Sequence, residues 1–265
     1  MRSIWHTFAL SGIDGRRCIK KQDGNFRLNS NLENIDPEEL CRFAAQADAW
    51  WAPRGELKAL HEINPLRLAY VRNRVGLAGR HVLDVGCGGG LLAEAMAAEK
   101  ALVTGIDMVA SALTVARKHA AETGIRVTYD QSTAEAWAQD HQADYDVITC
   151  MELVEHVPDP ALLTRTLAIL VRPGGHIFVS TVNRTWLARL LVIWASENLL
   201  GIVHKGTHTY HKFVQPEELI FWGRQSGLNL SNLSGVRYLP FIGHAALCKS
   251  TAMNYMVHFT RPDHA

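Results

Sequence analysis

The 265-residue chain lacks the features that define several large classes of protein. Its five cysteines are scattered, odd in number and without a Cys-x-x-Cys pair, so neither a disulfide framework nor a structural zinc site is indicated. No uninterrupted apolar stretch reaches the roughly 18 residues that span a bilayer. With a formal net charge of +1, the composition gives no case for nucleic acid as a partner. Of these absences, the lack of paired cysteines favours a reducing compartment.

Hydrophobic residues make up 48% of the chain, enough for one large core, and from His81 onward strands and helices alternate in the sequence. We expect strands at 81–85, 102–106, 126–129, 146–150 and 175–181. Helices are expected between them at 90–99, 111–122, 134–140 and 160–170. This alternation predicts an α/β fold with a mostly parallel sheet, helices on both faces, and ligands at the carboxyl ends of the strands. A helix starting at Gln215 and edge strands near 228–233 and 252–259 should follow.

The segment before residue 34 mixes Gly, Asn, Lys and Arg without a clear period and predicts a loose N-terminal extension over 1–33. A mitochondrial transit peptide within 1–30 is the alternative, and the Gly-rich middle and poor amphipathicity argue against it. Asp36-Pro37-Glu38-Glu39 has the N-cap acid and first-turn proline of a helix start, and predicts a helix to about Asp48. A second helix is expected to begin near Pro65. We expect both helices to cap a cofactor, within one domain over 34–265.

The most informative stretch is VLDVGCGGG at 82–90, which predicts a buried strand that ends at Gly86. The glycines that follow allow a sharp turn and leave no Cβ to block a ligand against the backbone. The next residues, LLAEAMAAE, are strong helix formers. A second apolar strand ends in Asp107, 21 residues after Gly86, where a carboxylate can accept hydrogen bonds from both ribose hydroxyls of a nucleoside. The unit therefore predicts a site for an adenosine-containing cofactor.

The glycine spacing bears on which cofactor binds. Dinucleotides usually need Gly-x-Gly-x-x-Gly before a helix N-terminus, whereas Gly86, Gly88 and Gly90 are more tightly spaced. The carboxylate of Asp84, just before them, would repel a pyrophosphate but suits the ammonium and sulfonium groups of S-adenosyl-L-methionine. The pattern Asp-x-Gly-x-Gly-x-Gly resembles motif I of the class I methyltransferases, which have a Rossmann-like fold. A dinucleotide, or a glycine loop used only as a turn, remains the alternative.

The fourth expected strand runs into three residues that could bind a metal or transfer a proton, Glu152, Glu155 and His156. One helical turn would place them on one face, at the crevice beside the glycine loop. Such a set could bind a divalent metal, or His156 could serve as a general base with Glu152 beside it. The alternative is that both glutamates are solvated and His156 packs the turn.

Longer motifs resemble the ubiquinone biosynthesis O-methyltransferases. The blocks that carry the resemblance lie at 60–68 (LHEINPLRL), 82–90, 146–160 (DVITCMELVEHVPDP), 172–175 (RPGG), 180–184 (STVNR), 205–208 (KGTH) and 254–256 (NYM). They span about residues 36–260 in order, and the Asn-Pro-Leu-Arg and Lys-Gly-Thr-His blocks are the most specific. Members often start near our first expected helix. The resemblance implies a seven-stranded sheet with an N-terminal helical cap and a helical insertion after the fifth strand.

The resemblance also implies an activity, the methylation of a polyprenyl catechol (2-polyprenyl-6-hydroxyphenol) and of 3-demethylubiquinol. By motif, Arg67, Gly86, Asp107 and Met151 would contact S-adenosyl-L-methionine, with Asp84 and Gly88 beside them. Some members are read as binding Mg2+ through residues matching Glu152, Glu155 and His156. A ubiquinone-biosynthesis complex and a cytoplasmic location at the inner face of the membrane would follow. Methylation of another small phenol, or a catalytically silent module that only binds S-adenosyl-L-methionine, remains the alternative.

An insertion over about 184–212 contains the apolar stretch 186–203. On a helix, Leu187, Leu190, Leu191, Trp194 and Ile202 would share one face. Such a stripe is either part of the core or a lid that touches the bilayer or the isoprenoid tail of the substrate.

Overall fold

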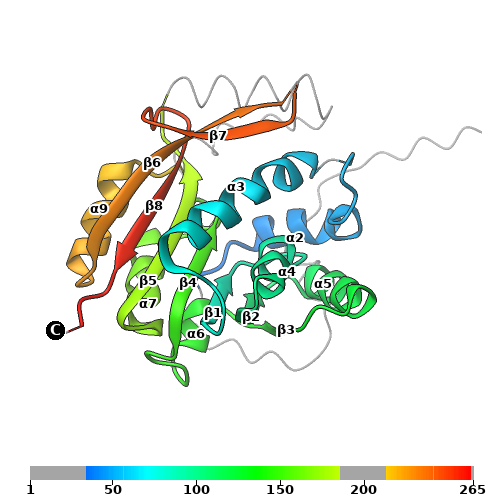
Figure 1. Ribbon diagram of the computed structural model, residues 1–265, viewed down its shortest axis with the longest axis horizontal. Coiled ribbons are helices and arrows are strands. Elements are labelled where there is room, and N and C mark those ends of the chain that lie inside the picture. Colours follow the sequence, from blue (N-terminus) through cyan, green and yellow to red (C-terminus); the bar gives the residue numbers. More distant parts are fainter. Residues whose placement is uncertain (1–33, 56, 186–212, 241, 264–265) are drawn as a thin grey trace, which may run out of the picture.

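The computed structural model describes residues 34–55, 57–185, 213–240 and 242–263 (Figure 1). The predictions for the extension over 1–33 and for the stripe over 186–203 lie outside these residues. Within the described ranges, no helix is both long enough and apolar enough to cross a membrane.

One eight-stranded sheet with the order β3-β2-β1-β4-β5-β8-β6-β7 forms the centre of the fold. The strands are β1 (His81–Val85), β2 (Leu102–Asp107), β3 (Val127–Gln131), β4 (Tyr145–Met151), β5 (Val171–Val182), β6 (Asn229–Leu239), β7 (His244–Cys248) and β8 (Asn254–Thr260). Strands β1 to β5 pair in parallel, and β8, β6 and β7 complete the sheet with antiparallel pairs. The predicted mostly parallel α/β sheet is confirmed, but it has eight strands rather than seven. The additional strand, β7, reads His-Ala-Ala-Leu-Cys and lacks the β-branched and aromatic residues that mark strands in a sequence.

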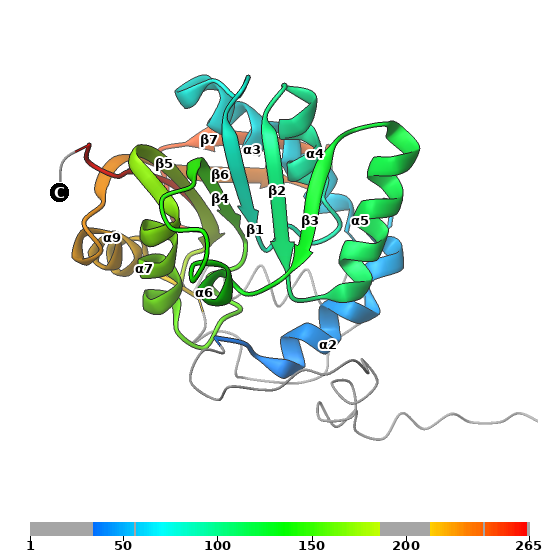
Figure 2. The same ribbon diagram turned by 90° about the horizontal axis from the view of Figure 1, so that it is seen from below.

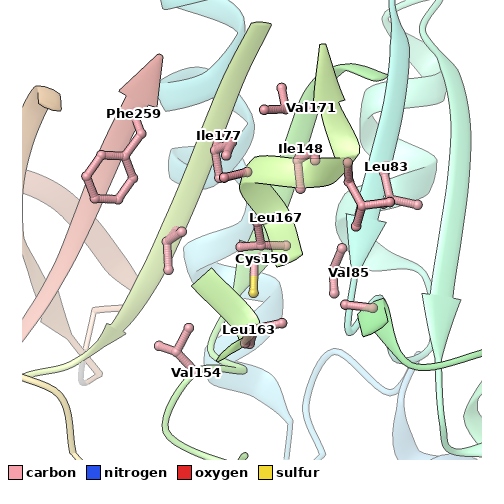
Figure 3. Packing of buried hydrophobic residues seen from close by; sticks show 14 of the residues in the cluster. Leu83, Val85, Ile148, Cys150, Val154, Leu163, Leu167, Val171, Ile177 and Phe259 are labelled. Carbon is pink, nitrogen blue, oxygen red and sulfur yellow. The ribbon is translucent and has the colours of Figure 1, made fainter. Parts of the chain in front are cut away.

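Helices cover both faces of the sheet (Figures 1 and 2). Their bounds are α2 (Pro37–Ala45), α3 (Lys58–Val75), α4 (Leu91–Ala98), α5 (Ala110–Thr123), α6 (Ala134–Trp137), α7 (Pro160–Leu170) and α9 (Pro216–Gln225). Side chains of α6, α7 and α9 form one buried cluster with the sheet, and those of α3, α4 and α5 form another on the opposite face. Figure 3 shows Leu163 and Leu167 of α7 packed against Ile148 and Ile177 in the first cluster.

Strand β5 shows how a central strand of this sheet buries apolar side chains on both of its faces. Ile177 belongs to the cluster under α7, whereas its neighbour Phe178 belongs to the cluster under α3. Successive side chains point to opposite faces of a strand, so a sheet covered on both faces buries both sets. Burial of each such side chain stabilises the fold by roughly 1.5–3 kcal/mol. The packed core therefore fixes the positions of the strand ends and of the residues that follow them.

Helix α2 and the residues that follow it up to Trp51 form a cap beyond the carboxyl ends of the parallel strands, whereas α3 packs on one face of the sheet and lines the cavity at these strand ends only with its N-terminal part. Helix α2 begins as predicted, with the Asp36 side chain accepting a hydrogen bond from the Glu38 backbone N–H, and ends at Ala45; the short 3-10 turn Ala47–Ala49 follows. Figure 2 shows α2 across the ends toward which the arrows of β2 and β3 point.

The start predicted for the second helix was wrong. Helix α3 begins at Lys58, and Pro65 lies inside it. A proline in a helix interior lacks one N–H donor, but the good helix formers before it extend the helix upstream. Asn64 ties α3 to the start of α4, because its Nδ2 donates to the Leu91 carbonyl at 3.0 Å.

Candidate active site

A cavity of about 520 Å³ lies where the carboxyl ends of the parallel strands meet the cap. The residues predicted to contact a cofactor all line it: Arg67, Asp84, Gly86, Gly88, Asp107 and Met151. Glu152, Glu155 and His156 line it as well. The fold therefore brings together side chains from α3, from the ends of β1, β2 and β4, and from the turn after β4. The same cavity is thus lined by the residues expected to bind the cofactor and by those expected to act in catalysis.

The glycine loop after β1 is packed beneath the cap. Gly88 has φ +53°, a conformation that glycine adopts without strain, and a Cβ at this position would overlap the indole of Trp50. Trp51 adds a hydrogen bond from its Nε1 to the Gly89 carbonyl at 2.9 Å. These two tryptophans were not predicted as site residues. The sequence gives no local signal that places them on a loop nearly 40 residues later.

Asp107 organises the same loop from the end of β2. Its Oδ2 accepts a hydrogen bond from the Gly88 N–H at 2.8 Å, and its Oδ1 accepts one from the Val109 N–H at 2.8 Å. Burial raises the pKa of the Asp107 carboxyl, although these backbone N–H groups oppose the rise. A carboxylate has about four lone-pair sites, so each oxygen can accept a further bond from a ribose hydroxyl. Asp107 is thus placed both to shape the loop and to receive a ligand.

Asp84 is the most deeply buried acid of the cavity, with only 3% of its surface exposed. Thr149 donates a hydrogen bond from Oγ1 to Asp84 Oδ1 at 2.6 Å. Burial raises the pKa of Asp84 to about 7, while the Thr149 hydroxyl and the Arg67 guanidinium oppose the rise. An ammonium group placed beside this carboxyl would favour its charged form and lower the pKa again. The site therefore suits a cationic ligand group and disfavours a pyrophosphate.

Arg67 reaches into the cavity from α3 and is 7% exposed. Its Nη2 lies 3.0 Å from Glu152 Oε1, and the Ser180 hydroxyl donates to the same carboxylate oxygen at 2.6 Å. Arg67 Nε is buried and has no hydrogen-bond partner among the described residues. A buried N–H group without a partner is costly, and the carboxylate of an amino-acid ligand could accept its hydrogen bond.

The turn after β4 does not form the predicted helical face. Glu152 has φ +54°, so the chain turns away from a helix at this residue. Glu155 is buried and accepts a hydrogen bond from Thr181 Oγ1 at 2.7 Å, and burial raises its pKa to about 7. His156 Nδ1 instead lies 3.3 Å from Glu39 Oε2 of α2. Burial alone would lower the pKa of His156, but the nearby glutamates Glu39 and Glu155 outweigh it and raise the pKa.

This arrangement corrects the predicted metal set. Glu152 is engaged by Arg67 and Ser180, Glu155 by Thr181, and His156 by Glu39, so the three side chains have different partners. Over the part of the chain that the structure describes, no group of three His, Cys, Asp or Glu side chains is placed to hold a metal ion. The donor set present does not fit a divalent cation in this arrangement.

The far wall of the cavity contains residues that sequence reasoning missed. Ser132 and Thr133 line it from the turn between β3 and α6, and Glu135 lines it from α6 itself. Asn34 joins them, donating from Nδ2 to Glu135 Oε1 at 3.2 Å and to the Asp159 carbonyl at 2.7 Å. Thr133 is the N-cap of α6 and could have been found by that signal. The contacts of Asn34 cross more than 100 residues and carry no local signal.

Comparison with known proteins agrees with this geometry. The sequence profile of a family described as "Methyltransferase domain" matches residues 58–233. The ubiquinone biosynthesis O-methyltransferase of Aeromonas salmonicida (strain A449) is 49% identical over 238 residues, which cover 89% of this chain and 100% of that protein. The protein with the same name from Yersinia pestis (strain Pestoides F) is 49% identical over 236 residues, covering 89% of this chain and 98% of its own.

Two solved structures show the same fold at low sequence identity. The magnesium protoporphyrin IX methyltransferase of Synechocystis PCC 6803, with bound SAH, has a TM-score of 0.55 and 17% identity, covering 77% of this chain and 83% of its own. The YcgJ protein of Bacillus subtilis has a TM-score of 0.58 and 14% identity, covering 75% of this chain and 99% of its own.

The packing of Trp50 on the loop makes a prediction for Gly88→Ala. The change adds a methyl group that overlaps the indole, besides the backbone strain of roughly 1–2 kcal/mol for a left-handed alanine. Gly79→Ala is the matched control, because Gly79 has φ +74° and nothing within 4 Å of its Cβ position. We expect Gly88→Ala to lose more stability in thermal unfolding than the control, and to lose affinity for S-adenosyl-L-methionine in calorimetry. Equal losses in the two variants would contradict the packing argument.

Proposed function

The chain belongs to the ubiquinone biosynthesis O-methyltransferases, and from this premise we propose how its residues carry out the reaction. It is an S-adenosyl-L-methionine-dependent O-methyltransferase. We propose that the acceptor is the phenolic oxygen of a prenylated ubiquinone precursor, both 2-polyprenyl-6-hydroxyphenol and 3-demethylubiquinol. The observation that supports this most is the single cavity that holds the six expected cofactor residues together with Glu152, Glu155 and His156.

The residues of the cavity match the groups of S-adenosyl-L-methionine one by one. In this assignment Asp84 holds the ammonium group, the Nε of Arg67 binds the carboxylate, and Asp107 binds the ribose hydroxyls. Gly86 and Gly88 leave the loop backbone open to the ligand, and Met151 packs beside it. The unpartnered Arg67 Nε and the raised pKa of Asp84 are the features that fit an amino-acid zwitterion.

The chemistry needs a good leaving group, an oxygen nucleophile and their alignment. When bound, S-adenosyl-L-methionine supplies a methyl group on a sulfonium that leaves as a neutral thioether. The acceptor oxygen must lose its proton as its bond to the methyl carbon forms, and we assign His156 to receive this proton. Glu152 acts through Arg67 by holding the guanidinium in place. Alignment of this kind can supply roughly 7–11 kcal/mol of the barrier.

A methyl-transfer assay tests the function directly. Purified protein, S-adenosyl-L-methionine and a short-chain prenyl catechol should give equal amounts of the methyl ether and the demethylated cofactor by mass spectrometry. Transfer only to phenols without a prenyl group would favour a different phenolic acceptor. No transfer to any phenol, with cofactor still bound, would make the protein a silent binding module.

The same assay tests whether turnover needs magnesium. Because Glu152, Glu155 and His156 have separate partners, we expect turnover to persist in excess chelator. Loss of turnover in chelator with retained cofactor binding, restored by added magnesium, would contradict the metal-free assignment.

The assignment of Asp107 predicts a loss of cofactor affinity in Asp107→Asn. The amide nitrogen cannot accept a ribose hydroxyl, and loss of charge-assisted hydrogen bonds worth about 1.5–3 kcal/mol each corresponds to roughly 10- to 100-fold. Calorimetry with the folded variant measures this, and Asp140→Asn at an exposed aspartate is the control. Unchanged affinity would overturn the assignment. Tighter binding of NAD than of S-adenosyl-L-methionine would overturn the cofactor class.

We also propose that residues 186–203 touch the bilayer, with the protein in the cytoplasm at the inner face of the membrane. Support comes from the substrate, whose prenyl tail stays in the bilayer, and from the apolar sequence pattern of this stretch. A mitochondrial matrix location would follow if residues 1–30 were a transit peptide. A ubiquinone-biosynthesis complex is a further candidate partner.

The lipid contact predicts that Trp194→Glu combined with Leu191→Glu abolishes flotation with anionic liposomes. Burial of one large side chain in lipid contributes roughly 1.5–3 kcal/mol, and two charges in its place oppose insertion. Turnover of a soluble short-chain catechol should survive. A variant that unfolds would place the stretch in the core, and a folded variant that still floats would place the contact elsewhere.

A further inference from the structure

Helix α2 presents three side chains to the imidazole of His156. Glu39, Arg42 and Phe43 are spaced three and four residues apart and so share one face of the helix. Glu39 Oε2 lies 3.3 Å and Arg42 Nη2 lies 3.4 Å from His156 Nδ1. The Phe43 ring meets the imidazole edge-on, with centroids 5.1 Å apart at 89°. The cap therefore contacts a residue whose backbone belongs to the turn after β4.

The local structure fixes Glu39 in this position. Asp36 caps α2 and Pro37 opens its first turn, so Glu39 occupies the third helical position. Glu39 also forms an ion pair with Arg42 one turn later. Just before the helix, Asn34 is bound to the backbone N–H and carbonyl of Asp159 at the start of α7. The entry to α2 is thus anchored to the body of the domain on the side that carries His156.

The two charged neighbours of Nδ1 demand opposite tautomers of His156. A carboxylate only accepts hydrogen bonds, so Glu39 requires a proton on Nδ1 and leaves Nε2 with its lone pair. A guanidinium only donates, so Arg42 would require the lone pair on Nδ1 and the proton on Nε2. Because Arg42 is already paired with Glu39, its charge is largely compensated. The carboxylate is the partner that can set the tautomer.

We propose that Glu39 is a positioning residue that holds His156 in the Nδ1–H tautomer, so that Nε2 accepts the proton of the acceptor hydroxyl. This inference rests on the proposed assignment of His156 as the base. The proton leaves the phenolic oxygen for Nε2 while the oxygen forms its bond to the methyl carbon and the sulfur–carbon bond breaks. The cap then supplies part of the reaction machinery as well as a cover for the cofactor.

Glu39→Gln tests this with nearly unchanged shape, because its amide N–H can donate to Nδ1 and force the other tautomer. In the serine-protease triad the comparable change of carboxylate to amide lowers kcat about 10⁴-fold. There the carboxylate is buried; Glu39 is partly exposed, so we expect a smaller loss of at least about 10-fold in kcat. The KM for S-adenosyl-L-methionine should change less than about twofold, since the lost contact does not touch the cofactor. Glu39→Asp should recover part of the loss, and Glu38→Gln, the same change at the exposed neighbouring glutamate of α2, is the matched control, with kcat expected within about threefold.

A spectroscopic readout separates positioning from a merely structural effect. ¹⁵N NMR of neutral His156 should show Nδ1–H in the unmodified protein and Nε2–H in Glu39→Gln. An Nε2–H tautomer in the unmodified protein would overturn the inference without any variant. Unchanged kcat in Glu39→Gln, or a loss of cofactor affinity as large as the loss of kcat, would also overturn it.

The failure of this inference can be told from failure of the proposed function. Full activity in His156→Gln would remove His156 as the base, and the assignment of Glu39 with it. Loss of activity in His156→Gln together with full activity in Glu39→Gln would leave the base in place and overturn Glu39 alone.

Discussion

The hydrogen bond from the Gly88 amide to the Asp107 carboxylate is the contact on which the site depends. It ties the glycine loop after β1 to the end of β2 and sets the floor of the cavity. Trp50 of the cap can then lie on this floor, because the loop has no side chain at Gly88. With the cap packed in this way, Arg67 and Glu39 reach the cavity from α3 and α2. A small change in the loop would therefore displace groups that come from distant parts of the chain.

The cavity combines buried acids with one buried cation. Burial raises the pKa of both Asp84 and Glu155 to about 7, because an apolar surrounding disfavours the charged form of each carboxyl. A ligand with an ammonium group and a carboxylate balances this set, because the ammonium group favours ionised Asp84 and the carboxylate satisfies Arg67 Nε. The ammonium group of the cofactor binds the ionised form of Asp84. Cofactor affinity should therefore rise as the pH increases through the pKa of Asp84, because above that pKa the carboxyl is already ionised before the cofactor binds. The charges of the site thus select a zwitterionic cation over a pyrophosphate.

Much of this arrangement could be predicted from local sequence patterns. Apolar runs predicted seven of the eight strands, and the spacing of Gly86, Gly88 and Asp107 predicted the cofactor class and residues that line the cavity. The prediction failed where the signal is not local. Because Glu152 adopts a left-handed conformation, Glu152, Glu155 and His156 do not share one face of a helix. The contacts of Trp50 and Glu39 depend on how the cap packs over the sheet. No periodicity in one segment can report such a contact.

Quinone analysis in cells that lack this protein tests the central claim most directly. We expect mass spectrometry to show loss of ubiquinone and accumulation of 2-polyprenyl-6-hydroxyphenol or 3-demethylubiquinol, and restoration of ubiquinone when the intact chain is returned. A normal ubiquinone profile without the protein, and no accumulated precursor, would contradict the account.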